Sequence, residues 1–480
     1  MRIQYNRLNF YTPWISFLLF IMIMTTVVIA QAQKTLSLTE AINQAIEENP
    51  NLASAEASLE ASRENIKIAQ GNYLPGVNLV GSLSQSKTAT FSETAGVIPA
   101  SSAIVGASLS QMIFNEKYLA NHKIQKYLYA SQEEQYRVSR YTIISAAGQA
   151  YIALLFADDL LDVQQENMLI TEQNLQASRD RQEVGSTNLQ EVLRWETQLF
   201  SNHQAVESQK ASVIVSRGGL NQILNVPLET RNEPEKLTIS KNGFIFSSNV
   251  VADAVNDERK AQIIRDYLVE LGLANSPALA SNDQQLLAQE RQVKSNKRWA
   301  IPQLNASAGA DAKFAFDEEG ADEIGDDFGF WKVGLTMYWP LVKGGANISK
   351  VKQSKFQMSA LELQRYNLMT SIEQSIRAST AVVMGDFKNI GFAQSQSETA
   401  QRNFDLVNDS YLVGESSLLN LLDAQTQKLG ADISSRVALY TFFIDLLTLE
   451  QAIGYFPFMQ PKDEADKIVG ELESRLLQVQ

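Results

Sequence analysis

The sequence predicts a mainly helical protein with a membrane β-barrel portion, built as a tandem repeat. Three observations lead to this fold class. Landmarks of the first half of the chain recur in the second half, two long stretches contain no proline, and short segments alternate apolar with polar residues. We therefore expect each repeat to contain a strand hairpin followed by a long antiparallel helical hairpin.

Prolines mark the repeat most clearly. Pro50 and Pro75 are 25 residues apart, and Pro277 and Pro302 show the same spacing. Further matches follow in the same order, at offsets of 227 to 229 residues, and such an ordered series rarely arises by chance. This divides the mature chain into a first structural repeat at 33–225, an inter-repeat segment at 226–274, a second structural repeat at 275–454 and a C-terminal tail at 455–480.

Residues 1–32 are interpreted as a secretory signal peptide. Arg2 and Arg7 precede an apolar run from Trp14 to Ala30, and Ala30-Gln31-Ala32 fits a cleavage site. The alternative is an uncleaved membrane anchor, because the apolar run approaches the length needed to span a bilayer. The small residues at its end favour cleavage.

The composition argues against an enzyme. The chain contains no cysteine and only two histidines, His122 and His203, so thiolate chemistry is excluded and a histidine-based centre is poorly supplied. A formal net charge of -13 argues against a nucleic-acid partner, which requires a basic face. We expect no metal site and no cofactor.

The stretches without proline predict two very long helices. Glu116 to Glu183 and Ala346 to Leu412 have apolar residues at helical spacing, and each helix would be about 100 Å long. Shorter helices, Asn188 to Leu224 and Ser417 to Ile453, are expected to return antiparallel to them. Helices of this length require parallel neighbours, so a coiled-coil cylinder or rod is the expected setting.

The same turn signal ends both long helices. Gly185 and Gly414 are predicted to adopt the left-handed conformation that ends a helix. Thr187 and Ser416 are predicted to cap the returning helices, with Gln190 completing a capping box three residues after Thr187.

The segments before the long helices change to a period of two. Apolar residues occupy alternate positions from Leu304 to Phe316 and from Trp331 to Trp339, with weaker equivalents from Val77 onward and from Val105 to Phe114. Each segment therefore predicts a strand with one apolar and one polar face.

A membrane barrel fits these strands better than a soluble sandwich. Trp331 and Trp339 share one face and lie about 26 Å apart along the strand, as in the aromatic girdles of a transmembrane barrel. The loop at 317–330 contains seven carboxylates and is expected in water outside the cell. Because four strands cannot close a barrel and open edges are not tolerated in lipid, several chains are expected to combine their strands.

Together these features resemble the TolC-type outer-membrane efflux and secretion channels. The resemblance covers essentially the whole mature chain and rests on the order and spacing of individually weak motifs. The motifs are Leu38-Thr39-Glu40-Ala41-Ile42, Asn49-Pro50, Leu74-Pro75, Tyr411-x-Val413-Gly414 and Leu421-Leu422-Asp423-Ala424.

The resemblance implies a homotrimer in the outer membrane of a Gram-negative bacterium. Each chain would contribute four strands to one twelve-stranded barrel, and the helices would continue it as a periplasmic tunnel. The segment at 226–274 and the tail at 455–480 would form an equatorial belt. A periplasmic adaptor, an inner-membrane transporter and outer-membrane lipid are the implied partners, and drug, metal and protein outlets share this architecture.

The resemblance also implies a pore constriction at the helix turns, at Glu191, Asn420 and Asp423. Asn420 departs from the aspartate that is common at this position in the best-known member of the family. Glu415 replaces a residue that in that member takes part in holding the entrance closed. Residues three apart on a helix share a face, so Asn420 and Asp423 can point together into a pore. The alternative is that they are ordinary solvated helix residues.

Two other classes of function are weighed against a channel. A periplasmic coiled-coil adaptor or scaffold would explain the long helices, but it does not need the aromatic strand from Trp331 to Trp339. An enzyme on a helical scaffold is disfavoured because no cluster of nucleophilic or acid-base residues is found.

Overall fold

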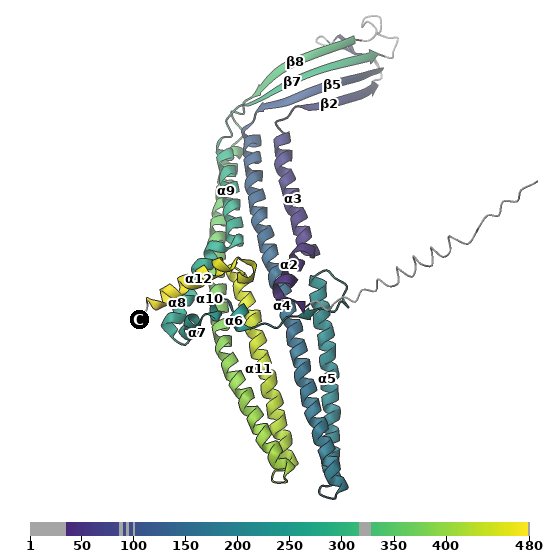
Figure 1. The fold of residues 1–480 in the computed structure, drawn as a ribbon. Coiled ribbons are helices and arrows are strands. Elements are labelled where there is room, and N and C mark those ends of the chain that lie inside the picture. Colours follow the sequence, from purple (N-terminus) through teal and green to yellow (C-terminus); the bar gives the residue numbers. More distant parts are fainter. Residues whose placement is uncertain (1–34, 86–89, 93–95, 99–100, 316–327, 479–480) are drawn as a thin grey trace, which may run out of the picture.

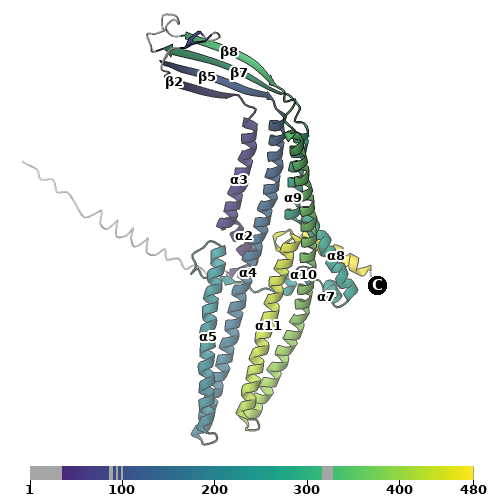
Figure 2. The ribbon, with the colours of Figure 1, turned by 180° about the vertical axis from the view of Figure 1, so that it is seen from behind.

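The protein is long and narrow, with a β-sheet at one end, the tips of two helical hairpins at the other end and short helices around the middle (Figures 1 and 2). This computed structural model describes residues 35–478 except 86–89, 93–95, 99–100 and 316–327. The predicted signal peptide at 1–32 and most of the predicted acidic loop at 317–330 lie outside the described residues.

The main elements occur twice in the same order. The first set is α3 (Pro50–Gly71), β2 (Gly76–Gln85), β5 (Ser101–Phe114), α4 (Glu116–Glu183) and α5 (Leu189–Ile223). The second set is α9 (Pro277–Lys297), β7 (Gln303–Ala315), β8 (Phe328–Tyr338), α10 (Ala346–Leu412) and α11 (Leu418–Ile453). The predicted bounds of both long helices, of 68 and 67 residues, are confirmed. Between β2 and β5 lie the short strands β3 (Thr90–Ser92) and β4 (Gly96–Ile98).

The prolines that mark the repeat begin equivalent helices. Pro50 is the first residue of α3 and Pro277 the first of α9, where a missing N–H group costs no hydrogen bond. The preceding residues cap these helices. Asn49 accepts a hydrogen bond from the N–H group of Asn51, and Ser276 accepts one from Leu279. The proline spacing is therefore a direct sign of helix starts.

The four long strands form one antiparallel sheet in the order β2-β5-β7-β8. Thus the hairpins of the two repeats lie side by side, joined through β5 and β7. The predicted strands are present, but Trp339 follows the end of β8 instead of lying within it. The indole Nε1 of Trp339 donates a hydrogen bond of 2.7 Å to the carbonyl oxygen of Ala300.

Strand register collects the apolar residues on one face of the sheet. Leu79 pairs with Ala107, Ala107 with Ala310, and Ala310 with Trp331, so these four residues form one row across the sheet. Leu79 is 82% exposed and Trp331 is 79% exposed. An apolar face this exposed in one chain requires a lipid or protein partner.

The opposite face of the sheet is more polar, although Val80, Ile104 and Phe330 also lie on it. In the adjacent row Ser108 pairs with Gly309, which pairs with Lys332. The ammonium group of Lys332 lies 3.6 Å from a carboxylate oxygen of Asp311 on the neighbouring strand. The predicted alternation therefore becomes a two-faced sheet.

The main hydrophobic core lies at the middle of the molecule. Its peripheral elements are β1 (Thr35–Leu36), α2 (Leu38–Glu48), β6 (Glu233–Pro234), α6 (Ile239–Asn242), the 3-10 turn η1 (Phe244–Ser247), α7 (Asn249–Ala254), α8 (Glu258–Asn275), η3 (Pro457–Met459) and α12 (Lys462–Leu477). Residues from all of these elements except β6, and from α4, α5, α10 and α11, pack in one hydrophobic cluster. Within it the hydroxyl of Tyr151 lies 2.8 Å from the carbonyl oxygens of both Leu36 and Glu235. Tyr151 thus joins the N-terminal strand, the long helix and the inter-repeat segment.

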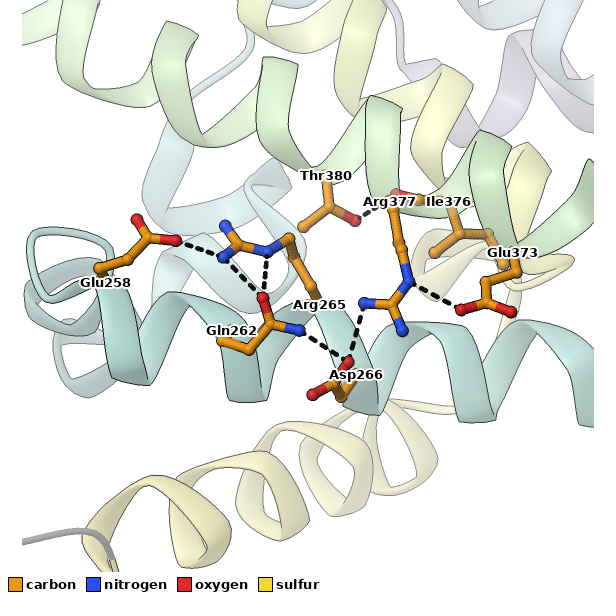
Figure 3. A network of polar contacts seen from close by, with 8 residues as sticks. All are labelled: Glu258, Gln262, Arg265, Asp266, Glu373, Ile376, Arg377 and Thr380. Carbon is orange, nitrogen blue, oxygen red and sulfur yellow. Dashed lines mark hydrogen bonds and ion pairs between the residues drawn. The ribbon is translucent and has the colours of Figure 1, made fainter.

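A polar network also joins this middle region to the long helix α10 (Figure 3). Arg377 on α10 bridges two carboxylates, lying 2.8 Å from Asp266 on α8 and 2.9 Å from Glu373 on its own helix. Gln262 donates to Asp266 at 2.9 Å and accepts from Arg265. Charged partners on both elements therefore hold α8 against α10.

Candidate functional site at the tips of the helical hairpins

Both hairpins turn through the same backbone motif. Gly185 has φ of 74° and Gly414 has φ of 82°, the left-handed region that glycine enters without steric cost. In the first turn Ser186 N–H bonds to the carbonyl of Arg181, and in the second Glu415 N–H bonds to that of Ser410. With the glycine N–H bonds to Gln182 and Tyr411, these contacts form a Schellman motif at each tip.

The predicted N-caps are wrong by one residue. The caps are Asn188, which accepts from the N–H group of Glu191, and Ser417, which accepts from Asn420. The Schellman motif uses two residues beyond the C-cap of each long helix, so the chain has not yet reversed at Thr187 or Ser416. The predicted capping box with Gln190 is absent for the same reason.

Glu191 lies in a network that joins the two repeats. One carboxylate oxygen lies 3.1 Å from the guanidinium of Arg181 and accepts a hydrogen bond from the hydroxyl of Tyr411 on α10. The other accepts from Thr187 at 2.6 Å. The indole of Trp195 donates to the Tyr411 hydroxyl at 3.3 Å. Glu191 is therefore partly buried between helices.

Arg181 and Tyr411 form the other half of this network. The guanidinium lies over the Tyr411 ring, 4.2 Å from its centroid, and donates to the Tyr411 carbonyl at 3.3 Å. Burial and the hydrogen bond to Glu191 raise the pKa of the Tyr411 hydroxyl, so this group remains a proton donor at neutral pH. We call Arg181, Glu191, Trp195 and Tyr411 the tip network.

A small hydrophobic cluster supports the tip network. Trp195 is fully buried and Tyr411 is 2% exposed, and both belong to this cluster, which is separate from the main core. The other buried members are Leu175, Val192, Phe404, Leu421 and Ala424. Because these residues come from α4, α5, α10 and α11, the tips of both hairpins are packed as one unit.

Asn420 and Asp423 lie outside the tip network. Both are exposed in the chain. The carboxylate of Asp423 accepts a hydrogen bond of 2.7 Å from Gln427, one turn further along α11. Asn420 makes a long contact of 3.4 Å to Ser416. Of the three predicted constriction residues, the structure leaves these two on the surface and places Glu191 among partners.

Arg181 and Trp195 are members of the tip network that the sequence did not indicate. Nothing in their local sequence distinguishes them, because their partner Tyr411 follows about 200 residues later. The sequence motif Tyr411-x-Val413-Gly414 drew attention to the tyrosine, but it gave no information about which residues the tyrosine contacts. Within the described residues, no group of three or more histidine, aspartate or glutamate side chains is placed to hold a metal ion.

These features define a class of protein, a channel subunit with an exposed apolar sheet at one end and packed helical tips at the other. Residues 41–226 and 268–455 each match the family model described as outer membrane efflux protein. The chain belongs to this family. The comparison favours a channel over an adaptor or scaffold.

Individual relatives agree with this assignment. The chain is 24% identical over 422 residues to the outer membrane protein TolC of Salmonella enteritidis, covering 87% of this chain and 82% of that protein. The solved structure of the Campylobacter jejuni CmeC outer membrane channel aligns with a TM-score of 0.69 at 18% identity, covering 91% of this chain and 89% of that one. The Vibrio cholerae protein VceC aligns with a TM-score of 0.69 at 16% identity, covering 87% and 96%.

Proposed function

We propose that this protein is the outer-membrane exit duct of a tripartite efflux or secretion system. Substrates would pass from an inner-membrane transporter, through a periplasmic tunnel of helices, to the cell exterior. One observation carries the proposal. A sheet with an exposed apolar face is followed by helices of 68 and 67 residues, so one chain would supply both a membrane-spanning wall and a long tunnel wall.

The sheet requires a trimer or a similar closed assembly. β2 and β8 are its edge strands, and each pairs with one neighbour among the described residues. Lipid cannot satisfy the backbone groups of a sheet edge, so β8 of one chain would pair with β2 of the next. Three chains with four strands each would close a barrel of twelve strands. Its apolar face would then contact lipid.

The membrane span is assigned to the sheet and not to a helix. Helix α4 contains a window that is long and apolar enough to cross a bilayer, but 56% of that window is buried inside this chain. By contrast, the apolar residues of the sheet are exposed together on one face. Trp331 and Trp339 are 79% and 55% exposed, and we assign them to the aromatic girdles at the two membrane surfaces.

The tips of the hairpins are assigned to the closed periplasmic entrance. Asn420 and Asp423 would face the pore of the trimer, with three Asp423 carboxylates at one level. Glu191 has a different proposed role, because its carboxylate already binds Arg181, Thr187 and Tyr411. It would hold the two hairpins of a chain together and keep the entrance narrow. The adaptor and the transporter would bind at this end.

Two measurements on the detergent-purified protein test the proposal. Mass determination is expected to show a trimer, and insertion into a planar lipid bilayer is expected to give single-channel currents. A monomer that stays soluble without detergent and produces no current would contradict the proposed function.

A further inference from the structure

A cavity lies in the middle region of the molecule, whereas the tip network lies at one end (Figure 1). Its volume is about 540 Å³, within the range of small-molecule sites. The inter-repeat elements α6 and η1 form one side, and η3 and α12 of the C-terminal tail form another. The end of α11 contributes Glu450.

Glu450 is the most unusual residue of this cavity. It is 2% exposed, and its Oε2 atom has no hydrogen-bond partner among the described residues. A buried carboxyl oxygen without a partner is costly, because it has lost its contacts with water and gained none in return. Folding alone therefore gives no reason for a glutamate at this position.

The repeat provides an internal comparison for Glu450. Leu220-Asn221-Gln222 of the first copy matches Leu449-Glu450-Gln451 of the second, so Asn221 occupies the equivalent position. Asn221 is fully buried, and its amide donates to the carbonyl oxygens of Leu228 and Thr230 at 2.8 and 2.9 Å. Its side-chain oxygen accepts from Asn232 at 2.8 Å. The first repeat therefore has a buried amide with hydrogen-bond partners at the position where the second repeat has a buried carboxyl oxygen without one.

Two neighbouring residues, Tyr455 and Phe244, also have features that folding alone does not explain. The hydroxyl of Tyr455, a residue 5% exposed, has no hydrogen-bond partner in the described part of the chain. Its ring lies 5.8 Å from that of Phe244, which lines the cavity. Phe244 has φ of 49°, a strained conformation for a bulky side chain. Strain of this kind is concentrated at ligand sites.

The charges of the cavity favour a cation. Lys241, Glu450 and Asp466 are the charged residues of its wall. The ammonium group of Lys241 lies 2.9 Å from Glu235, which compensates its charge. Two carboxyl groups then remain beside two aromatic rings, those of Phe244 and Phe458. Carboxylates and aromatic faces are the groups that recognise organic ammonium ions.

We propose that this cavity binds a small organic ammonium ion, which donates a hydrogen bond to Oε2 of Glu450 and packs its apolar body against Phe244 and Phe458. The site is separate from the channel entrance. It would make the middle region a place where a small amine binds and reinforces the contact between the inter-repeat segment and the tail.

Binding at this site is linked to a proton. Burial raises the pKa of Glu450 well above its ordinary value, so the empty site contains a neutral carboxyl group. An ammonium ion would replace that proton, so at pH values below the pKa of Glu450 its affinity should rise about tenfold for each unit by which the pH is raised. The other titratable groups around the site are Lys241 of α6, Tyr267 of α8, Tyr455 after α11, and Glu464 and Asp466 of α12.

Calorimetry with benzylammonium tests the proposal on the detergent-purified full-length protein. Titrations in two buffers of different ionisation enthalpy count the protons released. The wild type should bind benzylammonium and release close to one proton per chain. Glu450→Gln should weaken binding at least about tenfold and release none. Asp463→Asn, on α12 but outside the cavity wall, should behave as the wild type.

Benzyl alcohol, a neutral molecule of the same shape, separates charge recognition from simple filling of the cavity. It should bind the wild type and Glu450→Gln with similar affinity. A second variant, Phe458→Leu, should weaken benzylammonium binding while proton release remains. The proposal is overturned if benzylammonium does not bind the wild type, or if it binds equally well and with equal proton release to Glu450→Gln.

Discussion

The hydroxyl of Tyr411 on α10 donates a hydrogen bond to the carboxylate of Glu191 on α5, across 220 positions of sequence. The same carboxylate pairs with Arg181, whose guanidinium lies over the Tyr411 ring. One aromatic residue of the second repeat is therefore bound by two charged residues of the first. Any movement that separates the two hairpins at their tips must break these contacts.

Tyr411→Phe should shift the channel toward its open state. The variant retains the ring, the Arg181 contact and the packing, but it removes the hydrogen bond to Glu191. A hydrogen bond to a charged group contributes about 1.5 to 3 kcal/mol, so the ratio of open to closed channels should rise roughly 10- to 150-fold. Single-channel recording measures this ratio. Tyr366→Phe, at an exposed position of the same helix, is the control, and equal open probabilities in both variants would contradict the role of Tyr411.

Asp423→Asn should reduce cation selectivity of the closed entrance. Three carboxylates at one level attract cations and repel anions, whereas three amides contribute only dipoles. Asp423 is exposed, and within the described residues its side chain bonds to Gln427 alone, so trimer assembly should be unaffected. Reversal potentials across a salt gradient give the selectivity. Asp405→Asn, an exposed carboxylate of α10 bonded to Gln401, should leave it unchanged. If Asp423→Asn also leaves it unchanged, Asp423 does not face the pore.

Val333→Lys should impair assembly into the outer membrane more than Thr336→Lys. Both residues lie on β8, but Val333 is on the apolar face, opposite Ala308, and Thr336 is on the polar face, opposite Asn305. A lysine facing lipid costs about 2 to 4 kcal/mol near the bilayer midplane, whereas one facing the barrel interior stays in water. The yield of heat-modifiable trimers in the outer-membrane fraction compares the two. Equal yields would mean that the apolar face of the sheet does not contact lipid.

Asp386→Asn should change how stability depends on pH. Burial and the neighbouring carboxyl of Asp445 raise the pKa of Asp386 to about 6, above its value of about 4 in an unfolded chain. The folded state therefore binds this proton more tightly, and the wild type should gain stability as the pH falls from about 6 to 4. The variant lacks this gain. The unfolding temperature of Asp386→Asn should exceed that of the wild type at pH 7.5, and the difference should be smaller at pH 5.

Glu398→Gln is the control for this pH effect, because Glu398 is an exposed carboxylate on the same helix. The difference in unfolding temperature between Glu398→Gln and the wild type should be the same at both pH values. A pH-independent difference for Asp386→Asn as well would show that the two carboxyl groups of Asp386 and Asp445 do not share a proton.

The periodic elements could be predicted from the sequence, and the contacts at the tips could not. Both long helices have their predicted bounds because helix periodicity and the absence of proline are local properties. The capping prediction failed by one residue because Thr187 and Asn188 are both capping types, as are Ser416 and Ser417. Only the path of the turn decides which of them has the extended backbone of a cap.

The sequence by itself determined the repeat, the two-faced strands and the family, because each depends on spacing along one stretch of chain. The tertiary structure decided that Glu191 holds Tyr411 and that Glu450 lacks a hydrogen bond to Oε2 where Asn221 is satisfied. The first outcome depends on residues distant in sequence that meet when helices of the two repeats pack together. The second depends on the path that the chain takes after α5 and after α11. Side-chain type alone cannot show whether a buried polar group finds a partner, because the partner comes from elsewhere in the chain.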